Sequence, residues 1–268
     1  MKKFDGYLLV SDMDGTLLNS KGKLSEENRK AIDYFVENGG KFTLATGRMV
    51  PSVRRFIDKV NTNLPIILYN GTKIYDYTSE KTIYEEFLEE ERKERIEKLK
   101  EFNPSYGIEL YIDETVYIYQ DSRFTKRFSK LGYDIIFEVN EEVWKKKWTK
   151  VLILAEKEEL DKLEENFEES YGSGPIIRSG DNYLEIVPDK TSKGQALKQL
   201  IEAHNLHNHT VITIGDNMND VELLEVAHHG FAVNNGNERL IKLAKNLAPS
   251  NDENVIEFLI SKIENKEL

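Results

Sequence analysis

The sequence predicts an α/β protein whose parallel-sheet core is interrupted by an inserted α+β domain. Toward both ends of the 268-residue chain, short apolar runs alternate with amphipathic helical stretches. This alternation is typical of a parallel sheet covered by helices on both faces. Between about 81 and 187, helices instead alternate with pairs of strands. We therefore expect a Rossmann-like core formed by residues 1–80 and 189–268, with the inserted α+β domain over 81–188.

The first core segment predicts three strands and two helices. Ser25 is a suitable N-cap, and the glutamates that follow it would stabilise the positive end of a helix dipole. Pro51 suits the first turn of the second helix. The strands are apolar runs too short for helices, and we expect them over 7–10, 42–45 and 66–69.

The inserted segment predicts helices packed on one face of a mainly antiparallel sheet. Apolar residues recur at helical spacing around 88–99 and 160–167. Strands are expected over 109–119, 148–155 and 176–187, the first and last of these ranges being hairpins. Three tyrosines in the first hairpin could face a substrate or simply pack in the sheet: Tyr111, Tyr117 and Tyr119.

The last core segment predicts a helix that begins at Ser192, strands over 211–214 and 231–233, and a terminal helix around 255–260. The first three strands are expected to run outward in one direction, and the chain then returns on the other side of the first strand. This path gives the strand order 5-4-1-2-3, in which the first and fourth strands are neighbours.

Composition excludes several classes of function. The formal net charge of −11 argues against a nucleic-acid partner, which would require basic stripes. The chain has no cysteine, so disulfides, thiolate nucleophiles and cysteine–zinc sites are excluded. No apolar run approaches the ~20 residues of a membrane span, and the amino terminus does not resemble a signal peptide. We therefore expect a soluble, cytoplasmic protein without a membrane partner; the sequence does not fix its oligomeric state.

Two aspartates follow the first predicted strand. Asp12 and Asp14 are two residues apart, so they point roughly the same way if the chain stays extended. Adjacent carboxylates repel each other, whereas a divalent cation between them would make the arrangement favourable. Gly15 then allows a sharp turn of the backbone. This stretch alone is compatible with either a metal site or an acidic turn at the end of a strand.

Polar residues end three further predicted strands of the core. Thr46, Asn70 and the pair Asp216 and Asp220 occupy these positions, and in a parallel sheet all of them lie at the same edge, where ligands bind. The predicted strand order brings Asp216 beside the aspartates of the first strand. Several converging carboxylates suit Mg²⁺, which prefers oxygen ligands, better than zinc.

Four stretches of the chain resemble the motifs of the haloacid dehalogenase-like superfamily. They are Asp12-Met13-Asp14-Gly15-Thr16-Leu17-Leu18, Thr46-Gly47-Arg48, Lys193 and Gly215-Asp216-Asn217-Met218-Asn219-Asp220. The position of the insert, between the second and third motifs, is similar to that of the large α+β cap of the Cof-type phosphatases. The resemblance implies a magnesium-dependent phosphatase that hydrolyses a small phosphorylated metabolite, such as a sugar phosphate, through an aspartyl-phosphate intermediate.

The resemblance also implies roles for the individual residues. Asp12 would attack phosphorus, and Asp14 would serve as the general acid and base. Mg²⁺ would be held by the carboxylates of Asp12 and Asp216 and by the backbone carbonyl of Asp14, with Asp220 supporting this shell. The phosphoryl oxygens would be bound by Thr46, Lys193, the amide of Asn219 and backbone N–H groups near Met13 and Gly47, while Arg48 would reach the body of the substrate.

Other interpretations stay open from the sequence alone. The same aspartyl-phosphate could be passed to a sugar, as in a phosphomutase or phosphotransferase, and an acidic cluster with a lysine also occurs in non-enzymatic signalling modules. Some residues have purely structural alternatives: Thr46 as a helix cap, Lys193 as a solvated lysine, Asp220 at a helix amino terminus and Asn70-Gly71 as a turn. The histidines are expected to be exposed polar residues rather than metal ligands: His204, His207, His209, His228 and His229.

Overall fold

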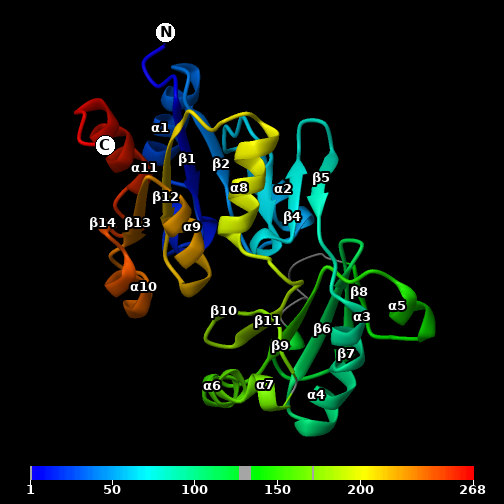
Figure 1. Ribbon diagram of the computed structural model, residues 1–268. Coiled ribbons are helices and arrows are strands. Elements are labelled where there is room, and N and C mark those ends of the chain that lie inside the picture. Colours follow the sequence, from blue (N-terminus) through cyan, green and yellow to red (C-terminus); the bar gives the residue numbers. More distant parts are fainter. Residues whose placement is uncertain (1, 127–133, 171) are drawn as a thin grey trace. The chain divides into compact units, whose positions relative to one another are not determined.

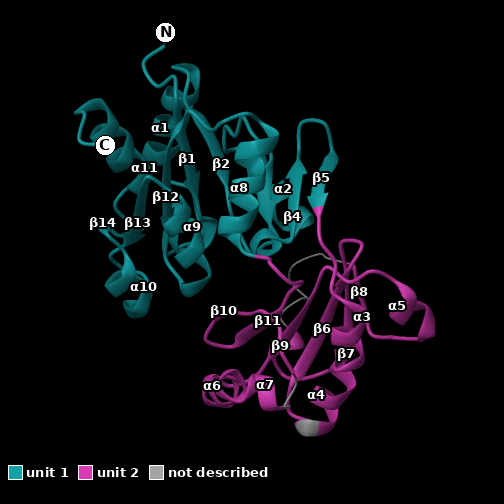
Figure 2. Ribbon diagram, in the orientation of Figure 1, with its two compact units in different colours: residues 1–84, 192–268 teal, residues 85–191 magenta. Residues whose placement is uncertain are grey.

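The computed structural model describes residues 2–126, 134–170 and 172–268. The chain divides into two compact units (Figure 2), the first formed by residues 1–84 and 192–268 and the second by residues 85–191. No helix in the described part of the chain is both long and apolar enough to cross a bilayer.

The chain enters the second unit after residue 84 and returns to the first after residue 191. These boundaries lie four and three residues later than the expected ones at 80/81 and 188/189. The first boundary lies later because strand β5 (Lys81–Glu85) belongs to a sheet of the first unit. Near the second boundary, Arg92 donates a hydrogen bond to the carbonyl of Val187, and the backbone N–H of Asp189 donates to Glu89. These contacts keep residues 187–189 with the second unit.

The first unit is built on a five-stranded parallel sheet with the order β14-β13-β12-β1-β2 (Figure 1). Strand β1 lies between β12 and β2, and Leu9 pairs with Ile212 on one side and Phe42 on the other. The order of the four strands β13-β12-β1-β2 confirms the prediction, whereas the edge strand β14 is too short for a sequence pattern to reveal. The bounds are Tyr7–Ser11 for β1, Lys41–Leu44 for β2, Thr210–Gly215 for β12, His229–Val233 for β13 and Asn246–Ala248 for β14.

Strand β3 (Ile66–Leu68) lies beside β2, as predicted, but it has little regular pairing with that strand. It meets β2 through a single parallel bridge between Ala45 and Ile67. Its regular partner is the antiparallel strand β4 (Lys73–Asp76), and β3, β4 and β5 form a separate sheet. Asn70 and Gly71 adopt φ angles of 57° and 105°, so the chain reverses immediately after β3. The sequence signal for a turn there was right, but it indicated a hairpin that the prediction did not include.

Helices cover the parallel sheet. Leu8 and Val10 of β1 pack in one apolar cluster with Leu197 of α8 and Leu223 of α9, while Leu9 points to the opposite face. Helices α1 and α11 pack against each other. The helix bounds are Glu26–Glu37 for α1, Val50–Ile57 for α2, Lys193–Ala203 for α8, Val221–Val226 for α9, Glu238–Leu243 for α10 and Val255–Glu264 for α11.

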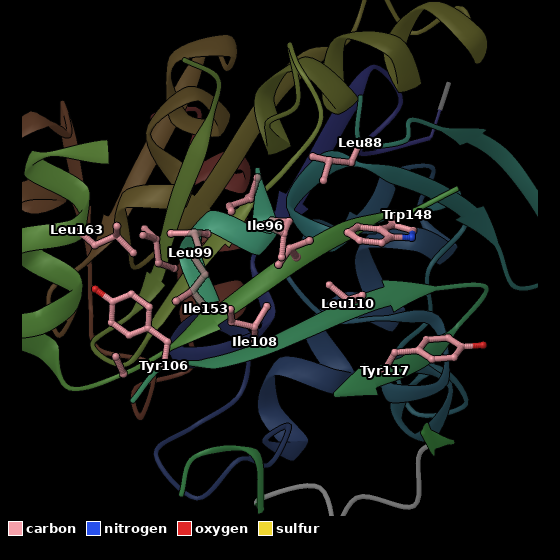
Figure 3. Packing of buried hydrophobic residues seen from close by; sticks show 14 of the residues in the cluster. Leu88, Ile96, Leu99, Tyr106, Ile108, Leu110, Tyr117, Trp148, Ile153 and Leu163 are labelled. Carbon is pink, nitrogen blue, oxygen red and sulfur yellow. The ribbon is translucent and has the colours of Figure 1, made fainter. Parts of the chain in front are cut away.

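The second unit contains a six-stranded sheet with the order β10-β11-β9-β6-β7-β8, antiparallel except between β7 and β8. Alternate residues of the strands pack against the helices (Figure 3), as Ile108 and Leu110 do with Ile96 and Leu99. The strand bounds are Gly107–Ile112 for β6, Thr115–Gln120 for β7, Ile135–Ile136 for β8, Lys150–Leu154 for β9, Ile176–Gly180 for β10 and Tyr183–Ile186 for β11. The helix bounds are Glu90–Glu94 for α3, Ile96–Phe102 for α4, Glu141–Lys145 for α5, Lys157–Glu165 for α6 and Phe167–Ser170 for α7.

The three tyrosines of β6 and β7 lie on different faces of this sheet. Tyr117 belongs to the apolar cluster on the helix face, and Tyr119 packs against that cluster. Tyr111 lies on the opposite face, where its hydroxyl donates to Glu109 at 3.0 Å. Sheet packing therefore accounts for Tyr117 and Tyr119.

Candidate active site

The loop after β1 and the loop after β12 are tied together. The backbone N–H of Asp12 donates to the carbonyl of Ile214 at 2.9 Å, so the chain leaves β1 alongside β12. The next residues form a tight turn, Met13–Leu17, in which Gly15 has φ +77°. The backbone angle favours glycine, and a Cβ there would lie 2.5 Å from Oδ2 of Asp216 and would displace that carboxylate.

Lys193 joins two carboxylates from different loops. Its Nζ atom lies 2.5 Å from Oδ1 of Asp12 and 2.6 Å from Oδ1 of Asp220. The ammonium group and both carboxylates are at least 94% buried. Lys193 is the first residue of α8, which Ser192 caps by accepting the N–H of Gln195. The alternative of a solvated lysine is wrong, because Lys193 is fully buried.

Asp220 uses its two oxygens for different purposes. Oδ1 faces Lys193, while Oδ2 accepts the backbone N–H groups of Asp216 at 3.0 Å and Asn217 at 3.1 Å. Asp220 does lie at a helix amino terminus, as in the structural alternative. It also holds the loop that carries Asp216. Gly215 makes this possible, because a Cβ there would lie 2.4 Å from Cγ of Asp220.

Burial and mutual repulsion dominate the electrostatics of the cluster. Burial raises the pKa of Asp12 well above its ordinary value; Lys193 acts against this, and Asp220 and Asp216 add to it. Burial, followed by the charge of Asp220, raises the pKa of Asp216 to about 7. Burial alone would lower the pKa of Lys193, but Asp12 and Asp220 outweigh it, so that its pKa is raised and the lysine stays charged. The buried carboxylates of Asp12 and Asp220 share one ammonium group, and the partly buried carboxylate of Asp216 lies beside them.

These carboxylates fit a divalent cation. One ligand atom from each of Asp12, Asp216 and Asp220 lies within 4.8 Å of the others, and no other such group occurs among the described residues. All three offer hard oxygen ligands, and Thr16 donates to Oδ1 of Asp216 at 3.3 Å, which orients that carboxylate. Burial and then the neighbouring carboxylates raise the pKa values of Asp12 and Asp216, and a divalent cation would favour their charged forms.

The loop after β2 is fixed by short-range hydrogen bonds. The backbone N–H of Thr46 donates to the carbonyl of Ile67, and the hydroxyl of Thr46 accepts the N–H of Arg48 at 3.2 Å. Thr46 is not the cap of α2, whose N-cap is Met49. Thr46 is 1% exposed, so its hydroxyl belongs to the interior of this loop.

The sequence predicts Asn70 at the ligand-binding edge of the sheet, with a turn as the alternative explanation, and gives it no specific catalytic or binding role. Asn70 is fully buried, its N–H donates to the carbonyl of Thr46, and its Oδ1 accepts from the side-chain amide of Asn219 at 2.9 Å. A Cβ on Gly47 would lie 3.0 Å from the amide group of Asn70. The sequence shows that Asn70 follows a strand. Because Asn-Gly is typical of turns, a turn was sufficient to account for the asparagine, and its hydrogen bond with Asn219 could not be predicted.

The remaining predicted residues are placed as follows. Met13 is fully buried beside Asp12 in the chain. The carboxylate of Asp14 is not part of the buried cluster; it forms two hydrogen bonds with Arg48, at 2.6 and 2.7 Å. Among the histidines, Nε2 of His207 pairs with Glu202, and Nδ1 of His228 accepts the N–H of Val211.

Comparison with known proteins agrees with this arrangement. The model of the haloacid dehalogenase-like hydrolase family matches residues 9–260. A 5-amino-6-(5-phospho-D-ribitylamino)uracil phosphatase of Bacillus subtilis is 27% identical, over 95% of this chain and 97% of its own. An X-ray structure from Thermotoga maritima is 30% identical with a TM-score of 0.79, covering 96% of this chain and 97% of its own. A haloacid dehalogenase-like hydrolase from Bacteroides thetaiotaomicron is 27% identical with a TM-score of 0.77, covering 96% and 99%.

The matches span nearly the whole length of this chain and of each relative. The chain therefore belongs to the haloacid dehalogenase-like hydrolases and is a Cof-type phosphatase, a phosphoric monoester hydrolase.

Proposed function

We propose that this phosphatase hydrolyses a small phosphorylated metabolite through an aspartyl-phosphate on Asp12, with Asp14 as general acid and base. The observation that carries the proposal is the contact of Asp12 with Lys193. Oδ1 of Asp12 is held at 2.5 Å by a buried ammonium group, so one oxygen of the carboxylate is fixed and the other is left to attack phosphorus.

The proposed reaction has two balanced steps. In the first, a carboxylate oxygen of Asp12 bonds to phosphorus, the bond from phosphorus to the ester oxygen breaks, and Asp14 protonates the leaving alcohol. In the second, Asp14 takes a proton from water, the water oxygen bonds to phosphorus, and the aspartyl bond breaks. Asp12 is regenerated, and the products are one alcohol and one inorganic phosphate.

The proposed binding residues supply charge and donors. Lys193, the hydroxyl of Thr46, the amide of Asn219 and backbone N–H groups near Met13 and Gly47 would bind the phosphoryl oxygens, because phosphoryl transfer depends mainly on positioning and charge stabilisation. Members of this family generally use a metal ion, and the proposed ion here is Mg²⁺. Asp12, Asp216 and the backbone carbonyl of Asp14 would hold it, with Asp220 as support, and when bound it would neutralise charge on the phosphoryl group.

The proposed substrate class is a phosphorylated sugar or sugar alcohol. The Bacillus subtilis relative is named for a substrate with a phosphorylated ribityl chain, which is a primary alkyl phosphate. An alkyl alcohol is a poor leaving group, which suits a mechanism with a general acid.

A phosphate-release assay tests the proposal. The purified protein is expected to release inorganic phosphate from sugar or sugar-alcohol phosphates without an added acceptor, and EDTA should abolish the release. Asp12→Asn should lose nearly all activity, at least about a thousandfold. Asp33→Asn on α1 serves as the matched control, because Asp33 pairs with Arg29 and with no residue of the site. Rapid acid quenching followed by mass spectrometry should find one phosphoryl group on a peptide containing Asp12. Turnover of Asp12→Asn at the rate of the unmodified protein would exclude the covalent route, and transfer only to an added sugar would indicate a phosphotransferase.

A further inference from the structure

Asp14 and Arg48 form a close, two-point ion pair. Nε of Arg48 lies 2.7 Å from Oδ2 of Asp14, and Nη2 lies 2.6 Å from Oδ1. Both carboxylate oxygens are thus engaged by the planar guanidinium group, in the paired geometry that an arginine makes and a lysine cannot reproduce.

The guanidinium group is itself held from two directions. Its central carbon lies 4.6 Å from the centroid of the Phe56 ring, so the ring of α2 supports it. The backbone of Arg48 is fixed as well, because its N–H donates to Thr46 and its carbonyl accepts the N–H of Tyr69. Arg48 therefore has a defined position even though its side chain is 24% exposed.

Asp14 has no comparable support of its own. Its side chain is 58% exposed, and it lies outside the buried cluster of Asp12, Asp216 and Asp220. An exposed aspartate without a partner would exchange among its rotamers, and a general acid that changes position loses much of its effect. Arg48 is the described side chain that restricts it.

We propose that Arg48 is a positioning residue that holds the carboxylate of Asp14 for its work on the leaving group, and that Phe56 holds Arg48. The inference rests on the proposed function, because it assumes that Asp14 is the acid and base. It differs from the expectation that Arg48 contacts the body of the substrate, because it assigns the guanidinium group to an enzyme carboxylate.

The dependence of the rate on the leaving group tests this inference. An aryl phosphate has a good leaving group and needs little help from a general acid, whereas an alkyl phosphate needs it fully. Asp14 also acts in the second step, which is the same for both esters, so the readout is kcat/KM, which covers only the steps up to departure of the alcohol. Arg48→Gln should lower kcat/KM about a hundredfold for an alkyl phosphate and by less than about threefold for an aryl phosphate. Arg48→Lys should recover only part of the loss, and Phe56→Leu should give a smaller loss with the same preference.

Arg54, on the helix that carries Phe56, offers a matched control. It pairs with Glu80 at 3.0 Å and lies over the ring of Tyr77 at 5.4 Å, so Arg54→Gln removes a similar arrangement away from the site. Arg54→Gln should leave both rates unchanged. The double variant Asp14→Asn with Arg48→Gln should be no slower on the alkyl phosphate than Asp14→Asn alone, because the two residues act as a unit.

Several results would overturn the inference. A purely structural role for Arg48 would slow both substrates equally, and direct contact with the substrate would raise KM with kcat unchanged. An additive double variant would also contradict it. A separate NMR measurement does not need activity: the Nε–Hε signal of Arg48 should exchange with water faster in Asp14→Asn, and an unchanged exchange rate would exclude the pair. If the unmodified protein hydrolyses neither ester, the proposed function fails, and with it the role assigned to Arg48, even where the NMR measurement detects the pair.

Discussion

Gly15 lies so close to Asp216 that a Cβ on Gly15 would be 2.5 Å from Oδ2 of that carboxylate. The two residues come from loops at opposite ends of the chain, and their contact is possible because β1 and β12 are neighbours. The carboxylate of Asp216 therefore occupies space that a side chain at position 15 would need.

Gly15→Ala is expected to impair the site beyond its effect on the backbone. The left-handed φ of +77° costs about 1 kcal/mol for a residue with a Cβ, and the new methyl group would also displace Asp216. Gly22→Ala is the matched control, because Gly22 has φ +67° but a Cβ there would meet no atom within 4 Å. We expect similar losses of stability on urea denaturation, and at least about a tenfold lower kcat/KM for Gly15→Ala only. Equal activities would show that Asp216 can move without consequence.

Lys193→Met is expected to destabilise the first unit strongly. It would leave Asp12 and Asp220 buried without the cation that lies 2.5 and 2.6 Å from them, and breaking a buried pair typically costs about 3–5 kcal/mol. Urea denaturation in metal-free buffer measures this loss, with Lys198→Met on the exposed face of α8 as the control. Adding Asp220→Asn to Lys193→Met should recover part of the stability. A double variant as unstable as Lys193→Met alone would mean that the repulsion between carboxylates is not the cause.

Asn70→Gly is expected to remove the side chain of Asn70 and leave its backbone conformation unchanged, so it tests the side chain alone. Glycine accepts the φ of 57° without strain, so the fold should persist while the hydrogen bond from Asn219 is lost. One hydrogen bond corresponds to about a tenfold decrease in kcat/KM. Asn254→Gly is the control, because Asn254 has the same φ and accepts a hydrogen bond from Ser25 instead. If both variants keep full activity, Asn70 is only a turn residue.

The stability of the metal-free protein is expected to fall as the pH rises toward and through 7. The pKa of Asp216 is about 7 in the folded state and about 3.9 in the unfolded state. Between these values the folded state holds the extra proton, so the stabilisation from this group is complete below about pH 4 and is lost as the pH rises through the folded pKa. Mg²⁺ binds the ionised carboxylates, so it should restore stability mainly at the higher pH.

Thermal melts check this pH dependence. The increase in Tm that MgCl₂ gives over EDTA should be larger at about pH 8 than at about pH 5.5. Asp216→Asn should be more stable than the unmodified protein at the higher pH without metal, and its Tm should respond little to Mg²⁺. A magnesium effect of the same size at both pH values would contradict the assignment.

Local sequence determined much of the fold. The apolar runs of β1, β2, β12 and β13 and the motifs that follow them are short-range signals, since each depends on a few adjacent residues. The order of these four strands also followed from the pattern, because alternating strands and helices allow few paths through a parallel sheet. The convergence of Asp12, Asp216 and Asp220 is a direct consequence of that order.

Tertiary structure alone decided several features of the site. Asn70 and Gly71 reverse the chain from β3 into the antiparallel strand β4, and the side chain of Asn70 there accepts a hydrogen bond from Asn219. Asp14 was expected beside Asp12, yet its carboxylate turns to Arg48. The sequence by itself thus determined the four central strands of the core and which carboxylates converge, because adjacent residues encode the strands and few strand orders are compatible with them. The partner of each side chain was decided only in the tertiary structure, because a hydrogen bond between distant residues depends on distances that no local pattern specifies.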